Sequence, residues 1–568
     1  MVNKELKQLI TEALEELSLK VEGFSVERPG ESKNGDYSSN VALVAFRQLA
    51  AQVNGKSNTI KMARGGMEFF DNPQQLADKI IEQIKSKNHP AILKMESAPA
   101  GFINLFLTPE FFITKVKEAL ELKDKYGENE DVKGYKVAVE YTDPNPFKLF
   151  HIGHLMPNVI GEAISRVAEA SGAEVKRMCY QGDVGLHVAK AIYGLQQGQA
   201  LFTAYAFGNK AYEEDEAAKL EIIELNKKVY SREDEEINKL YDAGKKESLE
   251  YFEQIYKKLG TKFDYYFFES EAGEFGKKVV EDNKQVFKVG ERGAVVYEGE
   301  QDGLHTRVFI NSEGLPTYEA KELGLAKIKY DKYPYDYSIV VTGNEITEYF
   351  KVLLAVMGKI FPELAQKTRH VPHGMLRLPS GKMSSRTGDV ITAENLLEEV
   401  KNKIKDKVKE SEMTDEVLTQ VAVGAIKYSI LKQDSSRDII FDFDKSISFD
   451  GSSGPYLQYT FARTQSILEK AKSEQVQIKL EQLEEVGEVE KIIARYGEAV
   501  YRAGEELAPH HIVTYLTELA SAFNAYYANN KIVSEEENSS YRVALTAAVG
   551  QVLKNGLSLL GIAAPVRM

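Results

Sequence analysis

Two histidines set three residues apart are the first candidates for chemistry in this chain. His151 and His154 stand in the run NPFKLFHIGHLM, with Gly153 between them and Lys148 just upstream. A glycine that allows close backbone approach, a helix N-terminus and a lysine together suit a phosphate group. Taken alone, an HxxH pair more often makes ordinary hydrogen bonds on a helix face. A zinc site is disfavoured, because the chain has one cysteine and no third histidine nearby.

A second stretch, LPSGKMSSRTGD at residues 378–389, has the composition of a phosphate-binding loop. Glycines bound it, and it offers two cations and the hydroxyl groups of two adjacent serines. In isolation such a loop is commonly a solvated basic turn. The candidate ligands in this loop are Lys382, Met383, Ser384, Ser385 and Arg386.

The elements around these residues predict a doubly wound parallel sheet. The run YKVAVEYTDPNP begins as a strand and is stopped by Pro144 and Pro146, which cannot donate to a ladder. A helix at about residues 153–172 and a second strand at about 173–183 follow. Ligands of such sheets bind beyond the carboxyl ends of the strands, where the two histidines stand. Further strand-like runs return at 293–300, 306–318 and 336–343.

The flanking segments predict two more domains. Residues 1–125 have the pattern of a small α+β module, in which residues 35–50 are expected to be helical. Charged helices at about 195–290 interrupt the sheet, and from about residue 390 the chain is helical to its end. We therefore expect domains at 1–125, 126–389 and 390–568, with the insertion in the middle one.

Composition limits the class of protein. A formal net charge of −14 argues against a nonspecific coat for nucleic acid, although it leaves room for a local basic face. Cys179 is the only cysteine, so an internal disulfide is impossible and a reducing, cytoplasmic compartment is expected. The first helix is too charged for a signal peptide, and no apolar run is long enough to span a membrane.

Together, the two candidate stretches resemble the paired signatures of the class I aminoacyl-tRNA synthetases. HIGH is present letter for letter, and KMSSR is similar to that family's KMSKS loop, in the expected order. VEYTDPNPFKLFHIGH, LPTYEAKELG, SFDGSSGPYLQYTFAR and VLKNGLSLLGIAAPVRM resemble runs of the arginyl-tRNA synthetases, and AGFINLFL resembles their appended domain. The resemblance covers nearly the whole chain. It implies a split Rossmann-type catalytic domain with a helical insertion, a small α+β N-terminal domain that contacts tRNA, and an all-α anticodon-binding domain.

The same resemblance implies a pocket for L-arginine. A guanidinium carries five donors and a permanent charge, so its pocket should present carboxylates and other acceptors. Tyr318 and Glu322 lie four apart on a predicted helix, hence on one face, and with Glu269 they match guanidinium-binding positions. Glu140 and Asn145 stand at the end of the first strand, where the α-ammonium and α-carboxylate would lie. The family usually has aspartate at the position of Glu322.

The implied reaction begins with attack of the arginine carboxylate on the α-phosphorus of ATP. The two histidines would donate hydrogen bonds there, and Lys148, Lys382 and Arg386 would attend the β- and γ-phosphates, which carry Mg²⁺. Ser385 stands where KMSKS has its second lysine, so we expect Lys148 to take over part of that lysine's role. The resemblance also implies that arginine is activated only when tRNA is bound.

Arginine tRNA is the expected macromolecular partner of a monomeric enzyme. Tyr456, Tyr459 and Arg463 recur at helical spacing, and two aromatic rings with a guanidinium can stack on unpaired bases. A buried tyrosine pair is the alternative. No editing domain is expected, because a guanidinium is distinctive enough to be selected directly. Further candidates for tRNA contact are Asn104, Phe106 and Met568.

Other interpretations stay open. A glutamyl-type class I synthetase would need a cationic side-chain pocket, whereas the candidates in this chain are carboxylates, and a cysteinyl type would need zinc ligands. A small-molecule nucleotidyltransferase could share the histidine motif but not the long helical C-terminal domain. A tRNA-binding paralogue without catalysis would be expected to lose His151, His154 or Lys382, and all three are present.

Overall fold

The structure, a computed structural model, describes the chain apart from residues 1, 53–59, 62–68, 379–390, 409–412 and 481–485. It divides into two compact units. The first comprises Met1–Gly127, Thr464–Ala499 and Ser521–Val552, and the second comprises Glu128–Arg463, Val500–Ala520 and Leu553–Met568. Within the described residues, no helix combines the length and the apolar character that crossing a membrane requires.

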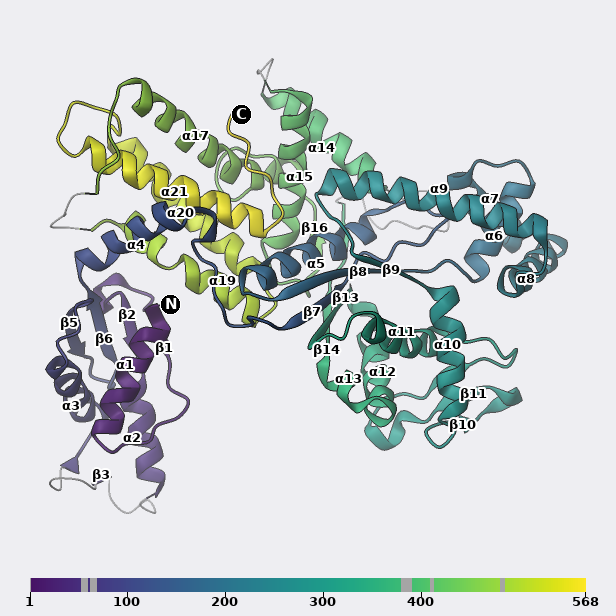
Figure 1. Cartoon of the computed structure of the whole chain (residues 1–568), viewed down its shortest axis with the longest axis horizontal. Coiled ribbons are helices and arrows are strands. Elements are labelled where there is room, and N and C mark those ends of the chain that lie inside the picture. Colours follow the sequence, from purple (N-terminus) through teal and green to yellow (C-terminus); the bar gives the residue numbers. More distant parts are fainter. Residues whose placement is uncertain (1, 53–59, 62–68, 379–390, 409–412, 481–485) are drawn as a thin grey trace. The chain divides into compact units, whose positions relative to one another are not determined.

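Five parallel strands form the central sheet of the second unit, in the order β14-β13-β7-β8-β9 (Figure 1). Every residue of β7 except its first is buried, as expected for a parallel strand that is covered on both faces. The chain passes from β7 to β8 in one direction across the sheet and from β13 to β14 in the opposite direction. Because both crossovers are right-handed, the helices that make them lie on opposite faces of the sheet. The predicted doubly wound sheet is confirmed. Its elements are β7 (Lys136–Glu140), α5 (Ile152–Ala170), β8 (Glu174–Gln181), β9 (Tyr265–Phe268), β13 (Tyr337–Gly343), α12 (Thr347–Ile360), α13 (Pro362–Lys367) and β14 (Thr368–His373).

The helical insertion ends earlier than the charge pattern indicated. It consists of four helices between β8 and β9, and β9 then pairs with β8 in the central sheet although it lies within the range 195–290. The sequence runs at 293–300 and 306–318 do form strands, but these belong to a separate antiparallel sheet, β10-β11-β12. The elements are α6 (Leu186–Gln196), α7 (Leu201–Glu214), α8 (Glu216–Ser231), α9 (Glu235–Leu259), β10 (Lys288–Val289), β11 (Val295–Tyr297) and β12 (Arg307–Ile310).

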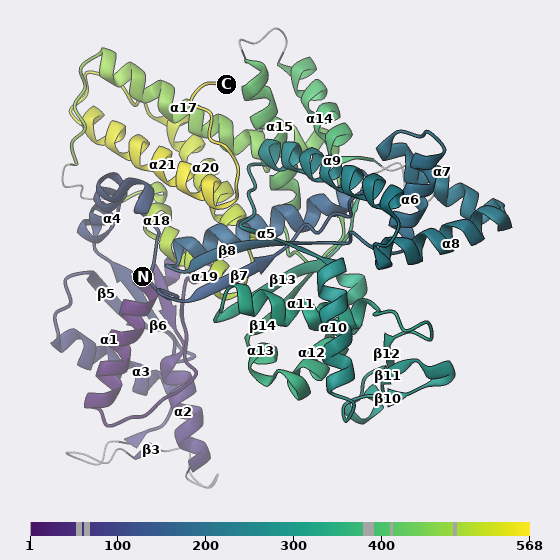
Figure 2. The ribbon, with the colours of Figure 1, turned by 45° about the vertical axis from the view of Figure 1, so that its right-hand side comes forward.

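Two helices, α10 (Glu269–Asp282) and α11 (Tyr318–Lys332), pack against each other at close range. A β-carbon on Gly276 would overlap the carbonyl of Ala320, and one on Gly324 would overlap the carbonyl of Ala272. Only glycine permits this approach. It holds the first turns of the two helices together on the same face of the sheet (Figure 2).

The remainder of the second unit is mainly helical, as expected from residue 390 onward, with one short parallel pair of strands. Lys427 is fully buried in α15, where its ammonium donates to the carbonyl of Gly561 at 2.7 Å. The elements are β15 (Leu376–Arg377), α14 (Ala393–Lys407), α15 (Asp415–Leu431), β16 (Ile439–Ile440), α16 (Phe443–Ser446), α17 (Gly454–Ser473), α19 (Tyr496–Glu505), α20 (His510–Asn529) and α21 (Ser539–Leu559), of which the last four also contribute residues to the first unit.

The first unit contains a four-stranded antiparallel sheet in the order β1-β2-β6-β5. The stretch 35–50 is not helical throughout, because its first part forms β2 and pairs with β6. In β6, Ile103, Leu105 and Leu107 belong to the apolar core, and the residues between them face the other side of the sheet. The elements are α1 (Val2–Glu16), β1 (Val26–Glu27), β2 (Tyr37–Ser39), α2 (Val41–Gln52), β3 (Ile60–Lys61), β4 (Phe69–Phe70), α3 (Pro73–Ser86), β5 (Ile92–Ser97), β6 (Ile103–Leu107), α4 (Pro109–Leu122) and α18 (Glu488–Ala494).

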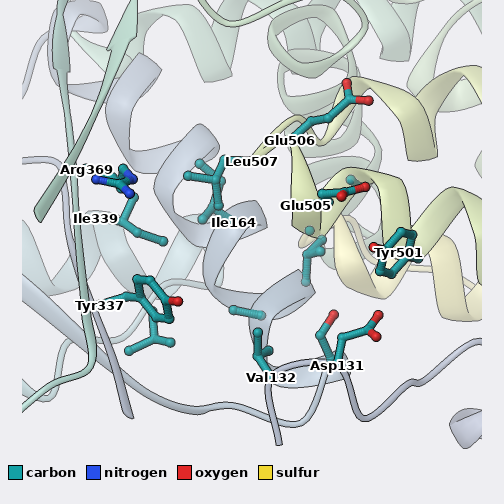
Figure 3. A pocket seen from close by; sticks show the side chains of 16 residues that line it. Asp131, Val132, Ile164, Tyr337, Ile339, Arg369, Tyr501, Glu505, Glu506 and Leu507 are labelled. Atoms are coloured by element: carbon teal, nitrogen blue, oxygen red, sulfur yellow. The ribbon is translucent and has the colours of Figure 1, made fainter. Parts of the chain in front are cut away.

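A cavity of about 590 Å³ opens in the second unit, but not at the predicted site. Val137 and Ile339, near the starts of β7 and β13, form part of its wall together with Ile164 of α5 and Leu507 (Figure 3). It therefore lies at the amino ends of the strands. The candidate site lies at their carboxyl ends.

Candidate active site

The segment that links β7 to α5 has an unusual backbone. Thr142, Asp143 and Phe147 all adopt positive φ, at 84°, 46° and 68°, which is rare for residues other than glycine. Hydrogen bonds from three other elements hold this shape: the Tyr180 amide donates to Asp143 at 2.7 Å, Asn158 donates to Thr142 at 3.0 Å, and the Phe147 amide donates to a serine of α9 at 2.9 Å. Strain held by surrounding structure is typical of functional sites.

The two histidines are locked at the N-terminus of α5. His151 Nδ1 accepts the Gly153 amide at 3.1 Å, and His154 Nδ1 accepts the His151 amide at 3.3 Å. The rings stack with centroids 3.7 Å apart. Burial, with the charge of Lys148, lowers the pKa of His151 to about 4, and burial holds that of His154 well below its usual range. Both rings are therefore neutral at pH 7, and each is left with one Nε2–H donor.

Lys148 is half-buried and in contact with the helical insertion. Its ammonium lies 4.4 Å from the centre of the Tyr205 ring of α7. Burial, followed by the charge of Lys190, lowers the pKa of Lys148 to about 8, so it still carries its charge at pH 7. The other predicted phosphate ligands, from Lys382 to Arg386, lie outside the described residues.

One group of carboxylates surrounds a buried lysine of α11. Glu140, at the end of β7, is 2% exposed and forms an ion pair with Lys329. Burial and the charge of Glu140 raise the pKa of Glu322 well above its usual range, while Lys329 opposes the shift. The hydroxyl of Tyr180 is buried in the same region, and among the described residues it has no hydrogen-bond partner. This group therefore contains two carboxyl groups, those of Glu140 and Glu322, but one ammonium group, that of Lys329.

A second group surrounds Gly182, just beyond β8. A β-carbon on Gly182 would overlap Asn145 Oδ1 and lie 3.1 Å from Glu269 Oε1, so both oxygens face this glycine. Glu269 begins α10 and is 6% exposed; its other oxygen accepts from Lys321 at 2.6 Å. Burial raises the pKa of Glu269, and Lys321 works against that shift. Tyr318, the first residue of α11, is 65% exposed, and its ring centre lies 5.4 Å from the Lys321 ammonium.

The five predicted arginine ligands thus gather at the carboxyl ends of β7 and β8, but in a different grouping. Sequence reasoning set Glu140 beside Asn145, and Glu269 beside Glu322. In the structure Glu322 senses the charge of Glu140, whereas Asn145 and Glu269 share the surface of Gly182.

Several residues of the site were not predicted. Asp183 is fully buried, and its carboxylate accepts from Tyr241 at 2.7 Å, from Lys245 at 2.8 Å and from the amide of Ser270 at 2.9 Å. It ties the end of β8 to the insertion and to α10. His187 contacts the Gly182 carbonyl at 2.8 Å, and burial lowers its pKa to about 3. The rule that ligands bind beyond strand ends would have pointed to both residues, since Asp183 ends the second predicted strand and His187 follows it.

The candidate tRNA residues of the second unit are partly exposed. Tyr459 is 38% exposed, the Arg463 guanidinium lies 4.9 Å from its ring centre, and Phe449 meets it edge-on at 6.1 Å. Tyr456 and Met568 are half-buried.

In the first unit, Asn104 is 9% exposed and accepts from Ser38 at 2.9 Å. Phe106 is half-buried beneath the ammonium of Lys94, 4.1 Å from its ring centre. Asn104 and Phe106 are two apart on β6 and hence lie on the same side of the strand. Asn104 also borders a hollow of about 320 Å³ with Arg28 and Asn34.

Comparisons with known proteins cover nearly the whole chain. Residues 115–443 match the family model described as tRNA synthetases class I (R), catalytic domain. Residues 457–568 match the DALR anticodon binding domain, and residues 4–107 match the arginyl tRNA synthetase N terminal domain.

Two curated relatives and one solved structure are described as arginine–tRNA ligases or arginyl-tRNA synthetases. The arginine–tRNA ligase of Bacteroides thetaiotaomicron is 30% identical, over 90% of this chain and 92% of its own. The arginine–tRNA ligase of Parabacteroides distasonis is 31% identical, over 88% of this chain and 91% of its own. The solved arginyl-tRNA synthetase of Thermus thermophilus has the same fold, with a TM-score of 0.79 at 24% identity and coverage of 100% of both chains.

Proposed function

The chain belongs to the class I arginyl-tRNA synthetases, and from that premise we propose how its residues share the work. The enzyme joins L-arginine to arginine tRNA in two steps, first forming arginyl-adenylate and pyrophosphate from ATP and then transferring arginine to the 3′ end of the tRNA. The arginine carboxylate is already ionised at pH 7, so no general base is needed. Catalysis then rests on positioning and on stabilising charge at the phosphates.

The observation that carries the catalytic assignment is that Nδ1 of both His151 and His154 accepts a backbone amide, which leaves each neutral ring one Nε2–H donor. Because both rings are neutral, their donor pattern does not change near pH 7, and they can hydrogen-bond the phosphate oxygens as charge develops. Lys148 supplies a cation from the same side. Lys382 and Arg386 are proposed to attend the β- and γ-phosphates, with Met383, Ser384 and Ser385 beside the nucleotide and Mg²⁺ held mainly by the phosphates.

The position of the histidines determines which end of the arginine must lie near the ATP. Its carboxylate must reach the α-phosphate near His151, and Asn145 lies in the same linking segment. We place the α-ammonium at Glu140, the last residue of β7, and at Asn145 Oδ1. The guanidinium then extends to Glu269, Glu322 and Tyr318.

Charge matching supports this orientation. Among the described residues, the carboxyl groups of Glu140, Asp143, Glu269 and Glu322 have two paired ammonium groups, those of Lys321 and Lys329, with a smaller effect of Lys148 on Glu269. A ligand with two positive charges, one at each end, would balance the negative charge that these lysines leave uncompensated. Arginine has them in its guanidinium and its α-ammonium.

For tRNA, we propose contacts through Tyr456, Tyr459, Arg463 and Met568 with the anticodon loop, and through Asn104 and Phe106 of the N-terminal segment with another loop. The functional segments are then 1–125, 126–389 and 390–568. We further propose a monomer in the cytoplasm; the single cysteine, Cys179, which is buried and free, suits a reducing compartment.

Amino-acid-dependent ATP–pyrophosphate exchange tests the proposal. It should be run with each of the twenty amino acids, with and without tRNA. Of the twenty amino acids, only arginine should support exchange, and it should do so only when arginine tRNA is present. Exchange with glutamate, or with no amino acid at all, would contradict the proposed pocket.

A further inference from the structure

Lys148, the cation that the proposed function assigns to the ATP phosphates, lies against an aromatic ring. Its ammonium is 4.4 Å from the centre of the Tyr205 ring of α7, and within the described part of the chain it forms no ion pair. A carboxylate partner would neutralise the lysine and compete with a phosphate for it. An aromatic face attracts the cation without neutralising it, so the N–H donors of the ammonium stay available.

The helix that carries this ring is held at close range to α6. A β-carbon on Gly208 would lie 1.9 Å from the carbonyl oxygen of Lys190, and one on Gly194 would lie 2.3 Å from that of Ala204. Only glycine permits such contacts. Because Ala204 precedes Tyr205 and Gly208 lies three residues beyond it, the backbone on both sides of the tyrosine is fixed against α6. The ring therefore starts from a defined position.

A second lysine is held in the same way two turns along α7. The Lys190 ammonium lies 4.1 Å from the centre of the Tyr212 ring and donates to Asn209 at 2.9 Å. Residues seven apart share one face of a helix, so this face of α7 presents two tyrosines, each to one lysine. The charge of Lys190 contributes to the low pKa of Lys148, which shows that the two ammonium groups repel each other. A polyanion such as the triphosphate of ATP would relieve this repulsion.

We propose that Tyr205 is a positioning residue for adenylate formation: its ring holds the Lys148 ammonium in place for the phosphates of ATP. This inference rests on the proposed function, in which Lys148 contacts those phosphates. A lysine side chain has many rotamers, and fixing one of them costs conformational entropy. A side chain that is already held near its bound position loses less of that entropy when the ligand binds. The helical insertion thus takes part in adenylate formation through this ring.

The groups around Lys148 make its charge a measurable sign of this contact. Burial and then the charge of Lys190 lower the pKa of Lys148 to about 8, while Glu269 of α10 raises it. A ring face favours the ammonium form, so removal of the ring should lower this pKa further. Three imidazoles also sense the ammonium, and burial holds the pKa of each far below 8. They belong to His151, His154 and His187.

The test is pyrophosphate exchange with tRNA present, measured over a range of ATP concentrations and of pH. Tyr205→Leu removes the ring and keeps an apolar side chain on α7. Its kcat/KM for ATP should fall by about two- to thirtyfold, the range of a cation–π contact, while the arginine KM stays within about twofold of wild type. The alkaline limb of kcat/KM, expected near pH 8 in wild type, should move to lower pH by up to about one unit. Tyr205→Phe keeps the ring face and should restore most of the rate and the position of the limb.

A double-mutant cycle separates positioning from packing. In a Lys148→Met background, Tyr205→Leu should lower kcat/KM for ATP by less than about twofold, because the ring no longer has a cation to hold. Equal losses in the two backgrounds would show that Tyr205 only supports the packing of the insertion, and the inference would be wrong. Phe207→Leu is the matched control and should match wild type, since it removes a partly exposed ring of the same helix that stacks on Tyr193.

Lys148→Met alone separates failure of this inference from failure of the proposed function. If Lys148→Met exchanges within about twofold of wild type, the assignment of Lys148 to the phosphates is itself wrong. If Lys148→Met loses rate while Tyr205→Leu keeps or exceeds the wild-type kcat/KM for ATP, that assignment stands and the inference alone is overturned. Tyr205→Met, whose unbranched side chain adapts to irregular space, provides the same comparison if leucine disturbs folding.

Discussion

Replacing Lys148 with alanine removes the one described cation beside the two histidines that the proposal assigns to ATP. Lys148 is half-buried, and its ammonium lies 4.4 Å from the centre of the Tyr205 ring. Its pKa of about 8 leaves about nine in ten molecules charged at pH 7. The side chain is thus preorganised for an anion, and burial has already removed part of its hydration.

The expected loss follows from that setting. A charge-assisted hydrogen bond to phosphate contributes about 1.5 to 3 kcal/mol, which corresponds to a rate lower by about ten- to a hundred-fold. Because Lys148 would contact ATP and not the amino acid, the arginine KM should change far less than the exchange rate.

Pyrophosphate exchange with tRNA present measures both quantities, and pH adds an internal control. A lysine is charged below its pKa and neutral above it, so its contribution should be present below about pH 8 and fade above it. In Lys148→Arg, kcat/KM for ATP should hold to higher pH, because a guanidinium stays charged. Lys351→Ala, at an exposed lysine of α12, is the matched control and should match wild type.

A second substitution tests the compensation argument. Lysine at Ser385, in the Lys148→Ala background, should restore part of the rate because it returns a cation to the same phosphates. An exchange rate within twofold of wild type in Lys148→Ala would show that this lysine is only a loop residue held against Tyr205, and the reasoning would fail.

Three further outcomes are expected. His151→Ala or His154→Ala should lower the activation rate by about 10² to 10³ with little change in arginine affinity, the usual loss for one such donor; a near-normal exchange rate in either variant would remove the assignment. Tyr459→Ala and Arg463→Ala should raise the KM for tRNA, with stacking contributing about 1 to 3 kcal/mol per base, while arginine and ATP affinities hold in aminoacylation assays; lower thermal stability with unchanged tRNA KM would instead indicate a core role. The wild-type arginine KM should rise as pH falls, because Glu322 holds its proton unusually tightly and a guanidinium binds the ionised form; Glu322→Gln should raise KM by about ten- to a hundred-fold and weaken that pH dependence, measured by the same exchange assay.

Local patterns were sufficient for the elements that carry the histidines. A strand stopped by prolines, a helix of regular apolar period and a second strand are each defined by neighbours in sequence, and they match β7, α5 and β8. The rule that ligands bind beyond strand carboxyl ends then placed His151 and His154 correctly at the start of α5. The same local reasoning missed β2, since a short strand before a helix has too few residues to show a period of two.

Only the tertiary structure decided how the carboxylates are grouped. Lys329 and Glu140 are 189 residues apart in sequence, and they meet because α11 crosses the face of the sheet where β7 ends. Lys321 reaches Glu269 because two glycines, Gly276 and Gly324, let α10 and α11 approach closely. The pKa of a buried group depends on which charges lie near it in space and on how much water is excluded. Neither quantity is encoded in spacing along the chain, so residue types could indicate an arginine pocket but not which oxygen of Glu269 is free to bind.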